Sequence, residues 1–277
     1  FVAAGLQPGD VYSVWAPNIA EWAVAALGGY LAAAVLVPIN TRFRGREAAY
    51  VMSRARVRVL FTVTDFLDTN YVELLREAHE ELPDLREIVV LRGPVPEGCI
   101  SFADWIARGK QVPDAEITTR SSSVRPDDVC HILFTSGTTG APKGAMLVHE
   151  AVCRVYDAWG DVIGLRAGDR NLVVNPFFHS FGLHCGILVS LMKGACCIPQ
   201  LVFDVPHTAA AEQPFNAWCA AGRALALGLD ALVSDDKGQP LHPDAFPMVG
   251  SELGELYEHL AERDLPAGSA AARRLFS

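Results

Sequence analysis

The chain has 277 residues, of which 51% are apolar and 20% are charged, and its formal net charge at pH 7 is −9. This length provides enough core for one large or two small domains, and the composition is typical of globular proteins. The acidic balance argues against a nucleic-acid binder, because neutralising phosphates requires clustered Lys and Arg. The densest basic stretch, residues 42–58, is interpreted as a solvated helix face.

The seven cysteines form no CxxC pair and no metal-ligand spacing. Most lie in apolar runs, where a free Cys behaves as a small hydrophobe. An odd count without a framework predicts a reducing compartment, and hence a cytoplasmic protein. We find no signal peptide, and a start at Phe1 instead of Met is compatible with a missing N-terminal piece. No metal-ligating residue is assigned.

The elements expected from apolar periodicity alternate between strands and helices over the first two hundred residues. The expected strands are 11–15, 35–39, 57–62, 87–91, 129–135, 171–175 and 195–198. The expected helices are 18–31, 46–55, 66–81, 102–107, 149–163 and 181–192. Two stretches, 92–98 and 111–128, are expected to be loops. Two further helices are expected at 217–227 and 252–262.

This alternation predicts an α/β fold, with mostly parallel sheets covered by helices. The stretch from Trp22 to Ile39 holds 18 residues without a charge, the lower limit for a membrane span. Its Ala and Gly content and the closing Pro38 favour a buried helix that leads into a buried strand. We therefore predict no transmembrane segment.

A loop rich in hydroxyl groups and glycine follows the strand expected at 129–135. Its sequence, FTSGTTGAPKG, runs from Phe134 to Gly144 and holds a single lysine, Lys143. Hydroxyls, backbone N–H groups exposed by glycine and a movable ammonium are good partners for phosphate oxygens. The composition therefore indicates a site for a nucleoside triphosphate or its pyrophosphate, since a simple turn needs fewer such residues.

Two better-known phosphate motifs do not fit this loop. The P-loop requires G-x-x-x-x-G-K-[ST], but Lys143 follows Gly140 by three residues, and Gly144 stands where the hydroxyl should be. The glycine spacing also differs from the dinucleotide-binding G-x-G-x-x-G. An ordinary kinase or NTPase is disfavoured, although ADP as product would support it.

The stretch FTSGTTGAPKGAML, residues 134–147, resembles the signature of the AMP-forming adenylating superfamily, and it is highly specific. This superfamily includes acyl-CoA synthetases, peptide-synthetase adenylation domains and beetle luciferases. NPFFHSFGL at 175–183 is similar to a downstream family motif, and residues 22–43 are similar to an upstream helix and strand. The resemblance covers residues 1–204, as a partial AMP-binding, large N-terminal domain. Residues 205–277 are expected to be a divergent tail, which is either the unrelated end of a truncated or frame-disrupted product or a real, divergent module.

The resemblance implies a ligase that uses ATP and Mg²⁺ to convert a carboxylic acid into an acyl-adenylate, and then coenzyme A to form the thioester. A fatty acid is favoured because PFFHSFGL is more similar to acyl-CoA ligases. The family pattern assigns the triphosphate to Thr135, Ser136, Gly137, Thr138, Thr139, Gly140 and Lys143. It also places His179 beside the acyl carboxylate. Lys143 and His179 are the two candidate catalytic residues.

Other histidines and aromatic residues receive less specific interpretations. His184 and Cys185 are expected to pack, since HSFGLHC has no metal spacing, and His149 is expected to be structural. Phe177, Phe178 and Phe181 either line an acyl pocket or belong to the core.

Three downstream family motifs are absent: Tyr-Gly-x-Thr-Glu, Thr-Gly-Asp and the C-terminal adenylating lysine. The alternative to an active ligase is therefore a catalytically incomplete fragment that at most binds nucleotide phosphates or a protein partner. The thiol acceptor, acyl chain length and oligomeric state stay open.

Overall fold

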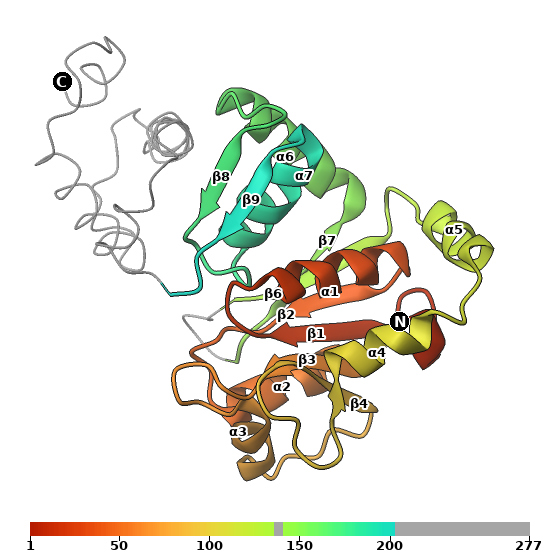
Figure 1. The fold of residues 1–277 in the computed structure, drawn as a ribbon, viewed down its shortest axis with the longest axis vertical. Helices are drawn as coiled ribbons and strands as arrows, with labels where there is room; N and C mark the ends of the chain where they lie inside the picture. The colour runs from red at the N-terminus through yellow and green to blue at the C-terminus, as the bar shows by residue number, and fades with distance from the viewer. Residues whose placement is uncertain (136–140, 203–277) are drawn as a thin grey trace, which may run out of the picture.

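The computed structural model describes residues 1–135 and 141–202 (Figure 1). A seven-stranded sheet with the order β5-β4-β3-β1-β2-β6-β7 forms its centre. The strands are β1 Val11–Trp15, β2 Val35–Pro38, β3 Val59–Val63, β4 Glu87–Arg92, β5 Ile100–Ser101, β6 Val129–Phe134 and β7 Gly144–Val148. Every neighbouring pair is parallel except β6 and β7, which are antiparallel. The predicted mostly parallel sheet is confirmed.

The two faces of β1 carry aromatic residues that pack against different helices. Tyr12 donates a hydrogen bond to the carbonyl of Ala26 in α1, at 2.8 Å. The ring of Trp15 stacks on Tyr71 of α3, with ring centroids 4.5 Å apart. Because positions 12 and 15 point to opposite faces of a strand, the sheet is covered by helices on both faces. The core therefore lies on both sides of the sheet.

Five α-helices of the described chain connect these strands, and two of them, α3 and α4, begin at side-chain caps. The five helices are α1 Ala20–Leu31, α2 Gly45–Ala55, α3 Tyr71–Glu77, α4 Phe102–Gly109 and α5 Asp114–Ser123. Asn70 accepts hydrogen bonds from the N–H groups of Val72 and Glu73 at the start of α3. Ser101 does the same for the N–H of Asp104 at the start of α4. Each cap satisfies N–H groups that a helix leaves without internal partners.

A second, two-stranded parallel sheet follows in the chain, with its helices (Figure 1). Its elements are α6 His149–Val162, β8 Arg170–Val173, the π-helix η2 Phe181–Leu188, α7 Val189–Lys193 and β9 Cys196–Pro199. The ammonium of Lys193 lies 2.8 Å from Asp157 and 2.7 Å from Asp161, and so ties α7 to α6. We call residues 170–199 the second region, and residues 1–109 the first region.

Some of the elements differ from the expectations. The stretch 111–128 is not a continuous loop, since it contains α5, and the helix expected at 66–81 is limited to α3, Tyr71–Glu77. The helix expected at 181–192 is present as an unbroken helical stretch, in which the π-helix η2 is followed by α7. Strand β7 was not expected, nor was the short β5. The boundary at residue 204 and the tail of residues 205–277, with the helices at 217–227 and 252–262, stay predictions, because residues 203–277 lie outside the described part.

The apolar stretch from Trp22 to Ile39 forms most of α1 and then β2. Trp22 and Ile39 are both fully covered by the fold. The strand is buried as expected, whereas α1 is buried on one face only, since Val24 and Leu31 are 52% and 55% exposed. In the described ranges, no helix has the length and apolar character needed to cross a membrane.

Candidate functional site

The predicted phosphate loop joins the two strands of a hairpin at the sheet's carboxyl edge. Strand β6 runs parallel to β2, and ends at Phe134, opposite Gly144 of β7. Loops at the carboxyl ends of parallel strands form the usual ligand site of α/β sheets. Of the predicted loop residues, Ser136, Gly137, Thr138, Thr139 and Gly140 lie outside the described residues.

Thr135 and Lys143 are brought together at the base of this hairpin. The N–H of Thr135 donates to the carbonyl of Lys143 at 2.9 Å, and the Thr135 hydroxyl approaches the same oxygen at 3.4 Å. Both side chains are exposed. Within residues 1–135 and 141–202, the Lys143 ammonium has no hydrogen bond or ion pair. This exposed cation therefore has no anionic partner within the described ranges.

Two further contacts fix the end of the loop next to Lys143. The hydroxyl of Tyr50, on α2, donates to the carbonyl of Pro142 at 3.2 Å. A Cβ on Gly144 would come within 2.7 Å of the Ile132 side chain, so that only glycine fits there without a shift. The last glycine of the motif is therefore required by packing between β6 and β7.

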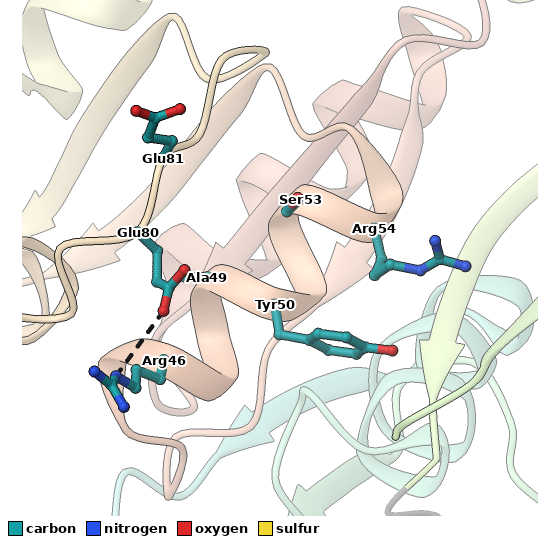
Figure 2. Close-up of a pocket in the computed structure, with 7 residues that line it drawn as sticks. All are labelled: Arg46, Ala49, Tyr50, Ser53, Arg54, Glu80 and Glu81. Carbon is teal, nitrogen blue, oxygen red and sulfur yellow. Dashed lines mark ion pairs between the residues drawn. The ribbon is translucent and has the colours of Figure 1, made fainter. Parts of the chain in front are cut away.

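A cavity of about 300 Å³ lies beside α2 and is lined by residues of this helix and by Glu80 and Glu81. Figure 2 shows Tyr50 and Arg54 pointing away from its acidic wall of Glu80 and Glu81. Arg46 and Glu80 form an exposed ion pair across the cavity, at 3.9 Å. Such exposed pairs contribute little free energy. The cavity holds no predicted site residue, and we assign it no part in the site.

His179 lies in the segment between β8 and η2. The backbone N–H of His179 donates to the carbonyl of Pro176 at 3.0 Å, and the ring atom Nδ1 accepts the backbone N–H of Phe181 at 3.2 Å. That bond leaves Nε2 to carry the proton of the neutral ring. Part of the imidazole is exposed, and loss of water around the rest lowers the pKa of His179 below its ordinary value. No described hydrogen bond joins His179 to Thr135 or Lys143.

Tight packing holds the segment that carries His179. A Cβ on Gly182 would lie 2.1 Å from the Pro176 carbonyl oxygen, so the start of η2 can approach residue 176 only because Gly182 has no side chain. Phe177 is buried, and its ring centroid lies 5.5 Å from that of Trp22 in α1. Phe177 therefore belongs to the core, which was one of the two interpretations considered for it.

A buried histidine pair, which the sequence did not reveal, joins β6 to η2. The Nε2 atoms of His131 and His184 lie 2.8 Å apart, and the hydroxyl of Tyr30 lies 3.3 Å from Nδ1 of His131. Burial, followed by the mutual proximity of the rings, lowers the pKa of His131 to about 3. Burial also lowers the pKa of His184 to about 4. The packing role expected for His184 is confirmed, since it is fully buried.

The described residues contain no cluster of three or more His, Cys, Asp or Glu side chains that could hold a metal ion. Burial raises the pKa of the Cys130 and Cys185 thiols to about 12, so these two cysteines are poor nucleophiles at neutral pH. Thr135, Lys143 and His179 therefore remain the candidate site residues in the described part of the chain.

The fold is that of the N-terminal part of adenylating enzymes. The crystallised N-terminal domain of FACL13 from Mycobacterium tuberculosis matches with a TM-score of 0.62 and 26% identity, covering 76% of this chain and 48% of that one. The anthranilate CoA ligase AuaEII, crystallised with anthranoyl-AMP, matches with a TM-score of 0.63 and 26% identity, covering 76% of this chain and 38% of that one.

The family model described as "AMP-binding enzyme" matches residues 1–255, and the chain belongs to this family. A dioxo-octahydroindenyl-propanoyl:CoA ligase from Rhodococcus jostii is 40% identical over 208 residues, which cover 74% of this chain and 40% of that protein. A ligase of the same name from Mycobacterium tuberculosis is 39% identical over 206 residues, with the same coverage. The chain thus spans about two fifths of the length of these curated relatives.

Proposed function

We propose that this chain supplies the phosphate loop and the acid-binding segment of an ATP-dependent acid–thiol ligase. A carboxylate oxygen attacks the α-phosphorus of ATP, and the bond from this phosphorus to the oxygen that bridges the α- and β-phosphates breaks. Pyrophosphate departs, and the product is an acyl-adenylate. The thiolate of coenzyme A then attacks the acyl carbonyl and releases AMP. We place this chemistry in the cytoplasm, in keeping with the free cysteines of the described chain.

The observation that carries this proposal is the exposed Lys143 at the base of the β6–β7 hairpin. In the first step, negative charge accumulates on the transferred phosphorus and on the departing pyrophosphate. A preorganised cation and hydroxyl or N–H donors stabilise that charge without a side-chain nucleophile. Lys143 would pair with the β- and γ-phosphates, and Thr135 with residues 136–140 would donate hydrogen bonds to them.

His179 would face the carboxylate of the acid. With Nδ1 engaged by the N–H of Phe181, its Nε2–H is left as a donor to a carboxylate oxygen. The lowered pKa favours the neutral ring, which would orient the acid by a hydrogen bond. ATP, Mg²⁺ and coenzyme A belong to the proposal for the whole enzyme. We assign no residue of this chain to Mg²⁺.

We propose a fatty acid as substrate, on the similarity of residues 175–183 to acyl-CoA ligases. A propanoate bearing an alicyclic ring is the second candidate. It is favoured by the two relatives at 40% and 39% identity, whose names specify such an acid.

The test is release of pyrophosphate, with AMP identified as co-product, from the purified chain given ATP, Mg²⁺ and a panel of acids. The panel contains octanoate, palmitate, a cyclohexyl-substituted propanoate and no acid. Release that depends on an acid supports the ligase, and the preferred acid chooses between the two substrate classes. ADP as the product would contradict the proposal.

The alternative, a catalytically incomplete fragment, predicts a different result in the same experiment. A folded chain would bind ATP but release no pyrophosphate with any acid. The absence of the three downstream motifs supports this alternative for the 277-residue chain by itself. Circular dichroism and ATP titration on the same sample separate this outcome from misfolding.

A further inference from the structure

The side chain of Asn18 lies where the two sheets meet, just after β1 and before α1. It is 6% exposed. Its Nδ2 donates to the carbonyls of Asn175, at 2.9 Å, and Val173, at 3.4 Å. Its Oδ1 accepts the N–H of Phe177 at 2.6 Å. One buried amide therefore holds three backbone groups more than 150 residues away in the sequence.

This set of contacts matches the chemistry of an asparagine and of no other short side chain. The amide offers two N–H donors and an acceptor. Here it donates to two carbonyls and accepts one N–H. An aspartate of the same shape would face two carbonyl oxygens with a carboxylate and no donor. A serine reaches less far and has a single donor. Buried polar groups that lose their partners cost free energy, so the arrangement is specific.

The three backbone groups belong to the segment that leads to His179. Fixing residues 175 and 177 fixes Pro176 between them, and the carbonyl of Pro176 accepts the N–H of His179 at 3.0 Å. The carbonyl of His179 in turn accepts the N–H of Leu183, inside η2. We call the contacts of Asn18 with Val173, Asn175 and Phe177 the Asn18 clamp. His179 lies two residues after the last of these.

We infer that Asn18 is a positioning residue, which sets the place and orientation of the His179 imidazole relative to the carboxyl edge of the seven-stranded sheet. The predicted phosphate loop leaves this same edge, after β6. The clamp therefore couples two parts of the site that come from different sheets. Its importance for catalysis rests on the proposed function, whereas the positioning itself does not.

The primary test is nuclear magnetic resonance of the histidine ring nitrogens in the isotope-labelled full chain. In the wild type, the His179 signals report an unprotonated Nδ1 and a protonated Nε2. In Asn18→Ala and Asn18→Asp, we expect this fixed tautomer to be lost, so that the two nitrogen signals move toward each other. The signals of the buried pair, His131 and His184, stay in place.

The matched control is Asn70→Ala, which removes another asparagine that binds backbone N–H groups, at the start of α3. This variant should leave the His179 signals unchanged. If Asn18 had a purely structural role, the Asn18 variants would shift the signals of all histidines or of none. Unchanged His179 signals in a folded Asn18→Ala chain would overturn the inference.

A measurement on the wild type covers the case in which neither Asn18 variant folds. We expect the amide hydrogen of Phe177 to exchange as slowly as those of β1, because Oδ1 of a buried side chain accepts it. Fast exchange at Phe177 in an otherwise protected chain would overturn the clamp.

If the wild type turns over, Asn18→Ala should lower kcat by roughly 100-fold with the KM for ATP unchanged, the effect of misplacing a group by about 1 Å. A wild type that binds neither ATP nor acid would contradict the proposed function. The response of His179 to Asn18 could still be measured, so the two failures are distinguishable.

Discussion

The interior of the first region and the boundary of the second region differ in the contacts that stabilise them. In residues 1–109, large apolar side chains from β1, β3 and the covering helices fill both sides of the sheet. Where the second region, residues 170–199, meets the rest of the described chain, apolar packing continues through Phe177 on Trp22, and buried polar contacts are added through Asn18 and the pair His131–His184. Apolar burial supplies most of the free energy of folding, but it is not directional. Hydrogen bonds are directional, so we infer that they set how the second region is oriented.

This contrast predicts that core deletions and polar variants have effects of different size and kind. A core deletion should destabilise the whole chain strongly. A polar variant where the two regions meet should destabilise it less, and should change mainly the second region. The predictions below follow this order.

The largest effect is expected from Phe61→Ala in β3. This ring is fully buried, and its centroid lies 5.3 Å from those of both Phe1 and Trp105. Removing it should lower the free energy of unfolding by about 3–5 kcal/mol, since the remaining cavity cannot collapse completely. Urea unfolding followed by circular dichroism measures this loss. A loss below about 1 kcal/mol would contradict the described core.

A smaller effect, dependent on pH, is expected from the histidine pair. The folded-state pKa values of about 3 for His131 and about 4 for His184 lie below the ordinary value of 6.5. Between these folded-state values and 6.5, the unfolded chain therefore binds more protons than the folded chain. The stability that the pair contributes is present above pH 6.5, and is lost progressively as the pH falls through 4 to about 3. The loss between pH 6.5 and 5 should be roughly 2 kcal/mol for one imidazole.

The measurement compares urea unfolding at pH 7.5 and pH 5.0 for the wild type and the double variant His131→Phe with His184→Phe. Each protein is compared with its own value at pH 7.5, so a lower stability of the variant does not obscure the result. The wild type should lose more stability than the variant. Equal losses would show that the pair is not buried as described.

The smallest effect is expected from Tyr50→Phe, which removes only the hydroxyl that binds the Pro142 carbonyl. A hydrogen bond of this kind contributes about 1 kcal/mol. Global stability should change by no more than that, while amide exchange at Lys143 and Gly144 becomes faster. Unchanged exchange at these two positions would contradict a tether between α2 and the end of the loop.

Sequence patterns located most strands because buried β-strands are short apolar runs. The bounds of β1 were predicted to the residue, and those of β2, β4 and β6 to within one residue. Helix α5 was missed because it has no buried residue and no apolar stripe. Its Thr118 and Thr119 hydroxyls instead donate to carbonyls one turn earlier. Strand β7 was missed because it begins with three exposed residues.

The candidate site could be predicted only where its residues are contiguous. Thr135 and Lys143 belong to one motif, and His179 to another. Asn18 and His131 carry no such signal, because their partners lie 53 to 159 positions away and their roles arise only from the fold. A lone asparagine after a strand has the same local pattern whether or not it binds a distant loop.

The most direct test of the central claim, that the loop containing Lys143 binds a triphosphate, is calorimetric titration of ATP into three folded proteins. These are the wild type, Lys143→Ala, and Lys110→Ala as a control that removes another exposed lysine, at the end of α4. Loss of a charge-assisted contact should weaken binding by about tenfold or more in Lys143→Ala, with Lys110→Ala unchanged. Equal ATP affinity in all three proteins would contradict the assignment of this loop.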